Sequence, residues 1–230
     1  LAADAEKRYG DLSPRGVQEH RGIAERMYAA YPEVFSTAKG RVCRIESRST
    51  QVPRCILSMA AFNERLKELN PAISATRDAS ARDMGYLANG PSLKASRKAA
   101  GEVADSLTRM RVNPDRLMKS LVTDPSCIDE PLELMNELFM LASITQDVSH
   151  LGIDPFYEIF TEEELYKLWE CENARRYLIM GPSARFGDPI VADAGPLLRN
   201  IVETADKVVE GKSDLSASLR FGHDTYVVPL

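Results

Sequence analysis

The stretch RIESRSTQVPRCILSMAAF, residues 44–62, joins an alternating segment to a helical one. Over 41–47 (RVCRIES) two apolar residues alternate with polar ones, which is typical of a short, half-buried strand. Pro53 suits the first position of a helix, and the residues after it predict a helix that ends near Leu69. The apolar residues expected along this helix include Ile56, Leu57, Ala60 and Leu66. A strand that leads into a helix favours an α/β fold.

Arg48 and Arg54 flank a Ser-Thr pair at this passage from strand to helix. Because Pro53 would begin the helix, Arg54 would lie in its first turn. Free backbone N–H groups and the positive end of the helix dipole favour an anion there. A guanidinium adds paired hydrogen bonds to phosphate oxygens. The stretch therefore predicts an anion-binding helix start, and the alternative is a solvated pair of arginines.

Further segments supply the rest of an α/β core. Ser13 can cap a helix that begins at Pro14, and 70–78 (NPAISATRD) is expected to be extended. A loop is predicted over 181–195, followed by an amphipathic helix over 196–211 that Gly211 ends. The segment 216–222 (SASLRFG) is the last candidate strand.

The middle of the chain is predicted to be helical throughout. The segments 92–110, 131–148 and 161–179 each have helical periodicity, and Thr161 with Glu164 forms a capping-box pattern. Trp169 fits the apolar spacing of its helix and is expected in the core. We therefore expect three parts: a first part of the α/β core (1–79), a helical insertion or lid (80–185), and a second part of the core (186–230).

His223 and Asp224 follow the last candidate strand directly. In open α/β sheets, functional sites form beyond the carboxyl ends of the strands. Gly222 before the pair allows the backbone to approach a ligand closely. The pair is therefore a candidate for chemistry, and the alternative is a turn whose polar groups satisfy each other.

Other reactive side chains point to no separate site. His20 and His150 are expected at the surface of helices or in a loop between them. The four cysteines have no Cys-x-x-Cys spacing, which argues against zinc and favours buried free thiols, with a disulfide as the alternative. No serine stands in a Gly-x-Ser-x-Gly setting, and no glycine-rich phosphate loop occurs.

Composition excludes several broad classes of protein. Of the 230 residues, 44% are hydrophobic and 27% are charged, which is typical of a folded globular chain. The formal net charge of −5 does not favour a nucleic-acid partner. No apolar run reaches the roughly 20 residues that a membrane span needs.

Three stretches resemble the histidine acid phosphatases, the branch of the histidine phosphatase superfamily that includes phytases. They are LSPRGVQEHRGIAERMYAAYPEVF (12–35), SRSTQVPRCILSMAAF (47–62) and LRFGHDTYVVPL (219–230). The likeness is closest to multiple inositol polyphosphate phosphatases and their bacterial relatives. It implies a mostly parallel α/β sheet core flanked by helices, with an all-helical insertion domain.

The resemblance also implies a chemistry. Phosphomonoesters, in this branch inositol phosphates such as phytate, would be hydrolysed through a phosphohistidine intermediate. Arg54 would hold the phosphate, His223 would be the second phosphate-contacting histidine, and Asp224 would protonate the leaving alcohol. Arg48 is a weaker candidate for phosphate binding. No metal or other cofactor is implied, and the family suggests a periplasmic or secreted protein that binds small molecules.

One family element is missing from the sequence. None of the three histidines stands in the Arg-His-Gly motif that carries the family's nucleophile. We therefore expect the nucleophile upstream of Leu1, so that residues 1–230 are a fragment with little turnover of its own. The His223-Asp224 motif also differs from the His-Ala-Glu motif of many inositol polyphosphate phosphatases. An acid or sugar-phosphate phosphatase on the same scaffold and a non-catalytic phosphate-binding protein remain alternatives.

Overall fold

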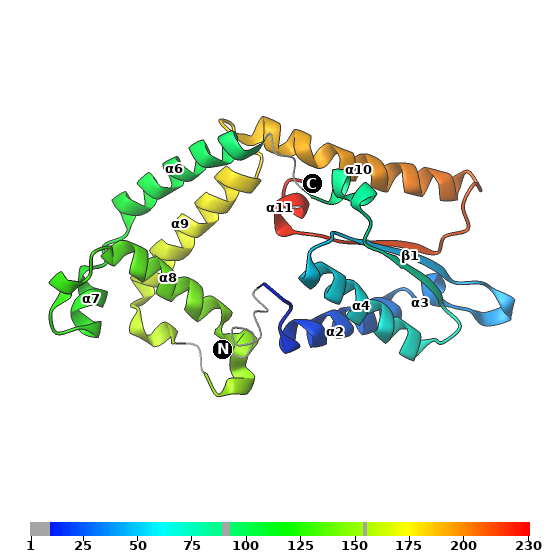
Figure 1. Cartoon of the computed structure of the whole chain (residues 1–230), viewed down its shortest axis with the longest axis horizontal. Coiled ribbons are helices and arrows are strands. Elements are labelled where there is room, and N and C mark those ends of the chain that lie inside the picture. Colours follow the sequence, from blue (N-terminus) through cyan, green and yellow to red (C-terminus); the bar gives the residue numbers. More distant parts are fainter. Residues whose placement is uncertain (1–9, 89–92, 154–155) are drawn as a thin grey trace. The chain divides into compact units, whose positions relative to one another are not determined.

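The computed structural model describes residues 10–88, 93–153 and 156–230 (Figure 1). Its contacts divide the chain into two compact units. The sheet unit comprises Leu1–Gly90 and Ala192–Leu230, and the helical unit comprises Pro91–Val191.

A three-stranded parallel sheet organises the sheet unit, with the strand order β2-β1-β3. The strands are β1 (Arg44–Ser49), β2 (Ser74–Asp78) and β3 (Ala217–Phe221). In the register of the sheet, Ile45 of β1 lies between Ala75 and Ala217. The helix α4 (Pro53–Leu69) follows β1, as the sequence predicts, with Pro53 in its first turn. The predicted α/β class with a parallel sheet is confirmed.

Helices cover one face of this sheet and bury its apolar side. Figure 1 shows α2 (Pro14–Ala30) and α4 on one side of the strands, with α3 (Pro32–Phe35) following α2. Ser13 caps α2 as predicted, because its hydroxyl accepts a hydrogen bond of 3.0 Å from the Gly16 N–H. The shared core consists of Ala24, Phe35, Cys43, Ile45, Phe62, Leu66 and Ile73.

The other face of the sheet lies toward α10 (Gly187–Val209), whose last eighteen residues, 192–209, belong to the sheet unit. Arg220 of β3 donates to the side-chain oxygen of Asn200 on this helix, at 2.6 and 2.9 Å. Near this face lie the 3₁₀ turn η2 (Ala81–Asp83) and the short helix α5 (Met84–Leu87). The chain ends with the short helix α11 (Asp224–Val227).

Two sequence predictions of element bounds were wrong. The first strand begins at Arg44 instead of 41, and Val42 is 59% exposed. The loop expected over 181–195 is largely helical, because α10 already begins at Gly187 and continues through Pro196. Its buried stripe of Ile190, Ala194 and Leu197 begins before that proline. The helix therefore continues through Pro196, although a proline inside a helix removes one backbone hydrogen bond and crowds the preceding turn.

The helical unit packs its four longer helices around a separate core. They are α6 (Leu93–Arg111), α7 (Asp115–Leu121), α8 (Pro131–Ile144) and α9 (Glu162–Met180). Short 3₁₀ turns connect them: η3 (Pro125–Cys127), η4 (Thr145–Leu151) and η5 (Tyr157–Ile159). The core residues are Val112, Leu117, Met118, Met135, Phe160, Leu168 and Cys171. In the described part of this unit no residue belongs to a strand.

The unit boundaries fall later than the predicted ends of the parts at 79 and 185. Leu87 explains the first difference. It is buried against Leu197 and Tyr226, so the helix α5, which ends at Leu87, associates with the sheet unit.

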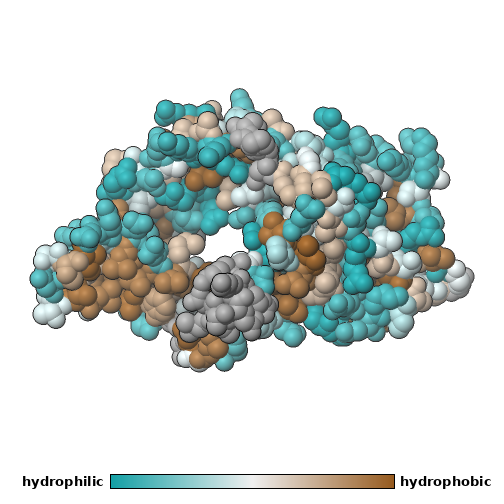
Figure 2. Space-filling model, viewed as in Figure 1, coloured by the Kyte–Doolittle hydropathy of each residue, from teal (hydrophilic) through white to brown (hydrophobic). Residues whose placement is uncertain are grey.

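Trp169 lies at the surface, which corrects the prediction that it is a core residue. It is 55% exposed and lies beside Tyr166, with their ring centroids 6.0 Å apart. The buried side of α9 is defined by Leu168 and Cys171, and the next residue after Leu168 turns about 100° away from it. Figure 2 shows further hydrophobic surface on this unit around α7 and α8, where Leu141 is 51% exposed.

All four cysteines are free thiols, as favoured by the sequence, and three of them are buried. Cys127 is the exposed one. Within the described ranges, none of the helices has the length and apolar character that crossing a membrane requires.

The capping box at α9 gives a stability prediction. The Thr161 hydroxyl accepts from the Glu164 N–H at 3.2 Å, and the Glu164 carboxylate accepts from the Thr161 N–H at 2.8 Å. Thr161→Ala is expected to lower the free energy of unfolding by about 1 kcal/mol, measured by urea denaturation. Thr123→Ala, in an exposed bend of the same unit, is the control. Equal losses in both variants would contradict the capping role.

Candidate functional site

Arg54 and His223 meet in the sheet unit although 169 positions separate them in the sequence. Arg54 lies in the first turn of α4, and His223 follows the end of β3. The Arg54 Nη2 atom is 3.2 Å from the His223 Nδ1 atom. The contact arises because β1 and β3 are parallel neighbours, with Ser49 opposite Phe221, so the residues after both strands emerge at one edge.

Thr50 completes this contact from the end of β1. Its Oγ1 atom is 3.2 Å from the His223 Nε2 atom, and its side chain is fully buried. Its backbone N–H donates to the carbonyl oxygen of Phe221 at 3.1 Å, which continues the pairing of β1 with β3. Sequence reasoning noted Thr50 only as part of the Ser-Thr pair. Its position directly after a strand is the signal that could have identified it.

Two further residues lie against the site and were missed from the sequence. The Cys55 thiol donates to the Gly222 carbonyl oxygen at 3.4 Å, and its sulfur is 3.9 Å from His223 Nε2. Gly10 has a positive φ of 76°, and a Cβ atom there would lie 3.7 Å from Arg54 Nη1. A buried cysteine in an apolar helix carries no sequence signal for a site, and neither does an isolated glycine.

The surroundings of His223 favour a neutral imidazole. Burial lowers the pKa of His223, and the nearby Arg54 guanidinium lowers this pKa further, while Asp224 acts in the opposite direction. In the absence of a ligand, the ring is therefore neutral at neutral pH. An anion placed beside Arg54 and His223 would compensate the guanidinium and favour the protonated ring.

Asp224 is exposed and begins the short helix α11. One of its carboxylate oxygens accepts a hydrogen bond of 2.8 Å from the Thr225 N–H. Because Asp224 is adjacent to His223 in sequence, its carboxyl group lies at the same edge of the sheet.

Arg48 is not brought to the Arg54–His223 contact. Ser47, the residue before it, donates to Asn63 of α4 at 3.0 Å, so Arg48 points to the opposite face of the sheet. There its guanidinium pairs with Glu46 and donates to the Tyr86 hydroxyl at 3.4 Å. Its partners therefore lie on the face opposite the Arg54–His223 contact.

A groove of about 350 Å³ lies beside the site, along β3 and between α2 and α4. His20 lies there, with its ring centroid 6.3 Å from that of Phe221, and burial lowers the pKa of His20. Most of the other lining side chains are apolar, among them Ile23, Met27 and Phe62. Such walls do not suit a polyanion, so the groove is not included in the candidate anion site.

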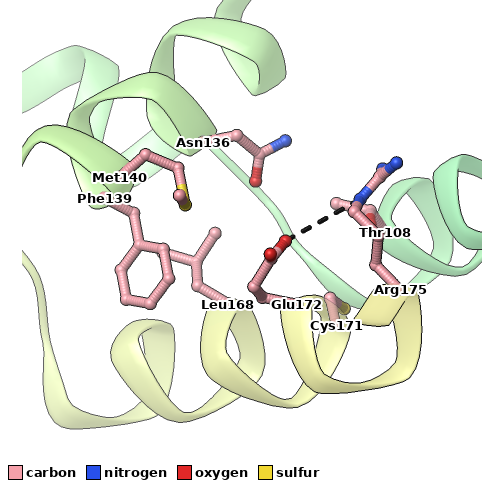
Figure 3. Close-up of a pocket in the computed structure, with 8 residues that line it drawn as sticks. All are labelled: Thr108, Asn136, Phe139, Met140, Leu168, Cys171, Glu172 and Arg175. Atoms are coloured by element: carbon pink, nitrogen blue, oxygen red, sulfur yellow. Dashed lines mark ion pairs between the residues drawn. The ribbon is translucent and has the colours of Figure 1, made fainter. Parts of the chain in front are cut away.

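The helical unit has its own pocket of about 200 Å³, lined by residues of α6, α8 and α9 (Figure 3). Arg175, its one lining arginine, already pairs with Glu172 at 3.8 Å and with Asp105. Burial raises the pKa of the Cys171 thiol in this pocket, which keeps the thiol protonated and unreactive. This pocket therefore lacks the free positive charge of the Arg54–His223 site.

The parallel α/β core is interrupted by a helical insertion and carries an arginine and a His-Asp pair at the carboxyl ends of adjacent strands, an architecture consistent with a histidine phosphatase-like fold. No protein-family model matches the chain, and no curated protein matches it either. Solved structures do match, and they confirm the predicted resemblance to histidine acid phosphatases at the level of the fold.

The first of these solved structures is the Bifidobacterium longum multiple inositol polyphosphate phosphatase in complex with inositol hexasulfate. It is 18% identical with a TM-score of 0.66, and the match covers 99% of this chain and 63% of that chain. The phytase from D. castellii is also 18% identical with a TM-score of 0.66. That match covers 95% of this chain and 48% of that chain, so the 230 residues span less than two thirds of the length of either protein.

Proposed function

We propose that Arg54, His223 and Asp224 form the phosphate-binding and proton-donating part of a histidine acid phosphatase. The observation that carries this proposal is the 3.2 Å contact between the guanidinium at the start of α4 and the imidazole after β3. Both groups can donate hydrogen bonds to phosphate oxygens, and the helix start adds free backbone N–H groups. Positive donors held in place are what phosphoryl transfer requires of a protein.

The proposed reaction has two steps. In the first, a histidine nitrogen attacks phosphorus, a P–N bond forms and the bond from phosphorus to the alcohol oxygen breaks. Asp224 gives its proton to that oxygen, so the alcohol leaves neutral. In the second, water attacks phosphorus, the P–N bond breaks, and the Asp224 carboxylate takes up a proton from the water. Arg54 and His223 hold the phosphate oxygens throughout.

We place the attacking histidine outside residues 1–230. His20, His150 and His223 lack an Arg-His-Gly setting, and His223 is already in contact with Arg54 and Thr50. Residues 1–230 are accordingly expected to bind phosphate but to release little of it from an ester. The parent protein would be the phosphatase.

Inositol phosphates are the proposed substrates. The B. longum protein of the same fold binds inositol hexasulfate, in which sulfate groups stand in for the phosphates of inositol hexakisphosphate. An acid phosphatase or a sugar-phosphate phosphatase would bind a single phosphate group in the same way. The substrate range must therefore be measured separately. The proposed setting is the periplasm or the cell exterior, with a small-molecule phosphomonoester as the partner.

The test is release of inorganic phosphate from inositol hexakisphosphate at mildly acidic pH. Residues 1–230 are compared with the same chain extended upstream to the natural start of its gene. We expect turnover in the extended protein and little in the shorter one. Turnover of glycerol phosphate or glucose 6-phosphate but not of the inositol ester would reassign the substrate. Anion binding without turnover in either form would favour a non-catalytic phosphate-binding protein.

The lowered pKa of His223 predicts how anion affinity depends on pH. As pH falls, the ring gains a proton and becomes a second positive donor, so affinity should rise as pH falls from 8 to 5. Sulfate is the appropriate probe, because its own charge does not change in this range. Calorimetric titrations at several pH values should show this rise, and His223→Gln should remove most of it. A pH-independent affinity in the unsubstituted chain would contradict the assignment.

A further inference from the structure

We infer that Thr50 is a positioning residue of this site, whose hydroxyl holds His223 with its proton on Nε2 and turns Nδ1 toward Arg54 and the incoming anion. The part of the inference that concerns the anion rests on the proposed function. The part that concerns the ring depends only on the geometry of the ligand-free site.

The partners of the two ring nitrogens determine where the proton lies. Arg54 Nη2 is 3.2 Å from Nδ1, and a guanidinium can only donate hydrogen bonds. Nδ1 of the neutral ring must therefore accept, which leaves the proton on Nε2. The Thr50 oxygen, 3.2 Å from Nε2, then accepts that N–H. The tautomer follows from these two contacts together.

Thr50 is the rigid partner and Arg54 is the movable one. The Thr50 side chain is fully buried, its N–H donates to the Phe221 carbonyl, and its carbonyl accepts from the Ser49 hydroxyl at 2.9 Å. Its β-branched side chain has few rotamers. Arg54 is exposed on the first turn of α4. An anion can thus draw the guanidinium away while Thr50 keeps the ring in place.

When an anion replaces Arg54 beside Nδ1, the His223 ring must take up a proton. An unprotonated Nδ1 cannot donate to an anion oxygen, so the ring takes up a proton there when the anion replaces Arg54. The charged and titratable groups that face the ring are Arg54 and Cys55 from α4 and Asp224 from α11. Once the anion engages Arg54, the carboxylate and the anion both favour the imidazolium. Anion binding is therefore coupled to proton uptake at Nδ1.

The first test reads the tautomer in the ligand-free chain by long-range ¹H–¹⁵N NMR of labelled histidines at neutral pH. His223→Gln identifies the signals of His223 among those of the three histidines. We expect the Nε2–H tautomer in the unsubstituted chain and in Thr50→Ser. In Thr50→Val we expect a mixture of tautomers, because the Nε2–H loses its acceptor while the exposed Arg54 can turn away from Nδ1. An Nδ1–H tautomer in the unsubstituted chain would overturn the inference. This measurement does not depend on whether any variant folds.

The second test is calorimetric titration with sulfate in buffers of different ionisation enthalpy, which measures the protons taken up. Loss of one neutral hydrogen bond corresponds to about a fivefold loss of affinity. We expect this loss in Thr50→Val, with affinity and proton uptake retained in Thr50→Ser. Thermal unfolding of each variant controls for misfolding.

The two tests separate this inference from the proposed function. In one outcome, Arg54→Ala abolishes sulfate binding, while Thr50→Val keeps the tautomer, the affinity and the proton uptake of the unsubstituted chain. Thr50 then has no positioning role, and the proposed phosphate site is retained. In the other outcome, sulfate does not bind to the unsubstituted chain, and the Nε2–H tautomer is lost in Thr50→Val but not in Thr50→Ser. The positioning role of Thr50 is then retained, and the proposed phosphate site is rejected.

Discussion

Arg54→Ala is expected to lower the affinity of the chain for sulfate or phosphate by about 10- to 100-fold, because a hydrogen bond to a charged group is worth about 1.5–3 kcal/mol. If the proposed phosphatase activity is found in the chain extended upstream, the same change should reduce its phosphate release by about 10²- to 10³-fold, the usual cost of one preorganised donor. Calorimetry measures the first effect and steady-state kinetics the second. Arg54→Lys should recover only part of either loss, since an ammonium cannot form paired hydrogen bonds.

Arg15 provides a matched control for this experiment. It follows Pro14 in the first turn of α2, as Arg54 follows Pro53 in the first turn of α4, and its side chain is 60% exposed. Arg15→Ala should leave affinity and turnover unchanged. A similar loss in both variants would mean that the effect comes from total charge, and would contradict a specific role for Arg54.

Asp224→Asn is expected to lower turnover of alkyl phosphates by about 10²- to 10⁴-fold, the usual contribution of a general acid. Nitrophenyl phosphate should be affected far less, because nitrophenolate leaves without a proton. The ratio of the two losses, measured as kcat/KM in the proposed phosphatase, isolates proton donation from binding.

Asp206→Asn, at an exposed position on α10, controls for the loss of one negative charge. It should change neither rate. Equal losses on both substrates in Asp224→Asn would assign this residue to binding or folding, and the acid role would have to be given up.

The sequence predicted the part of the fold that local patterns determine. Pro53 marks the start of α4, Ser13 caps α2, and Thr161 with Glu164 forms the capping box of α9, because each of these depends on residues within one turn. Arg54 and His223 were selected separately, one from its helix start and one from its place after a strand. Their contact depends on the parallel pairing of β1 with β3, which no local pattern contains.

The structure differs from the sequence predictions, or adds to them, where tertiary contacts determine the position of a residue. Trp169 has the spacing of a core residue but is exposed, because Leu168 and Cys171 define the buried side of α9. Pro196 suggested a helix start but lies inside α10. Arg48 was a phosphate-binding candidate, yet strand alternation turns it to the other face of the sheet. Thr50 belongs to the site because its hydroxyl lies 3.2 Å from His223 Nε2, a contact between two strand ends that no local pattern predicts.

A crystal structure of the chain with inositol hexakisphosphate tests the central claim most directly. We expect one phosphate group between the Arg54 guanidinium and the His223 imidazole, within about 2.7–3.2 Å of both, with Thr50 still in contact with the ring. The mutual contact of Arg54 and His223 would then be broken. A phosphate bound elsewhere, with that 3.2 Å contact intact, would contradict the assignment of this site.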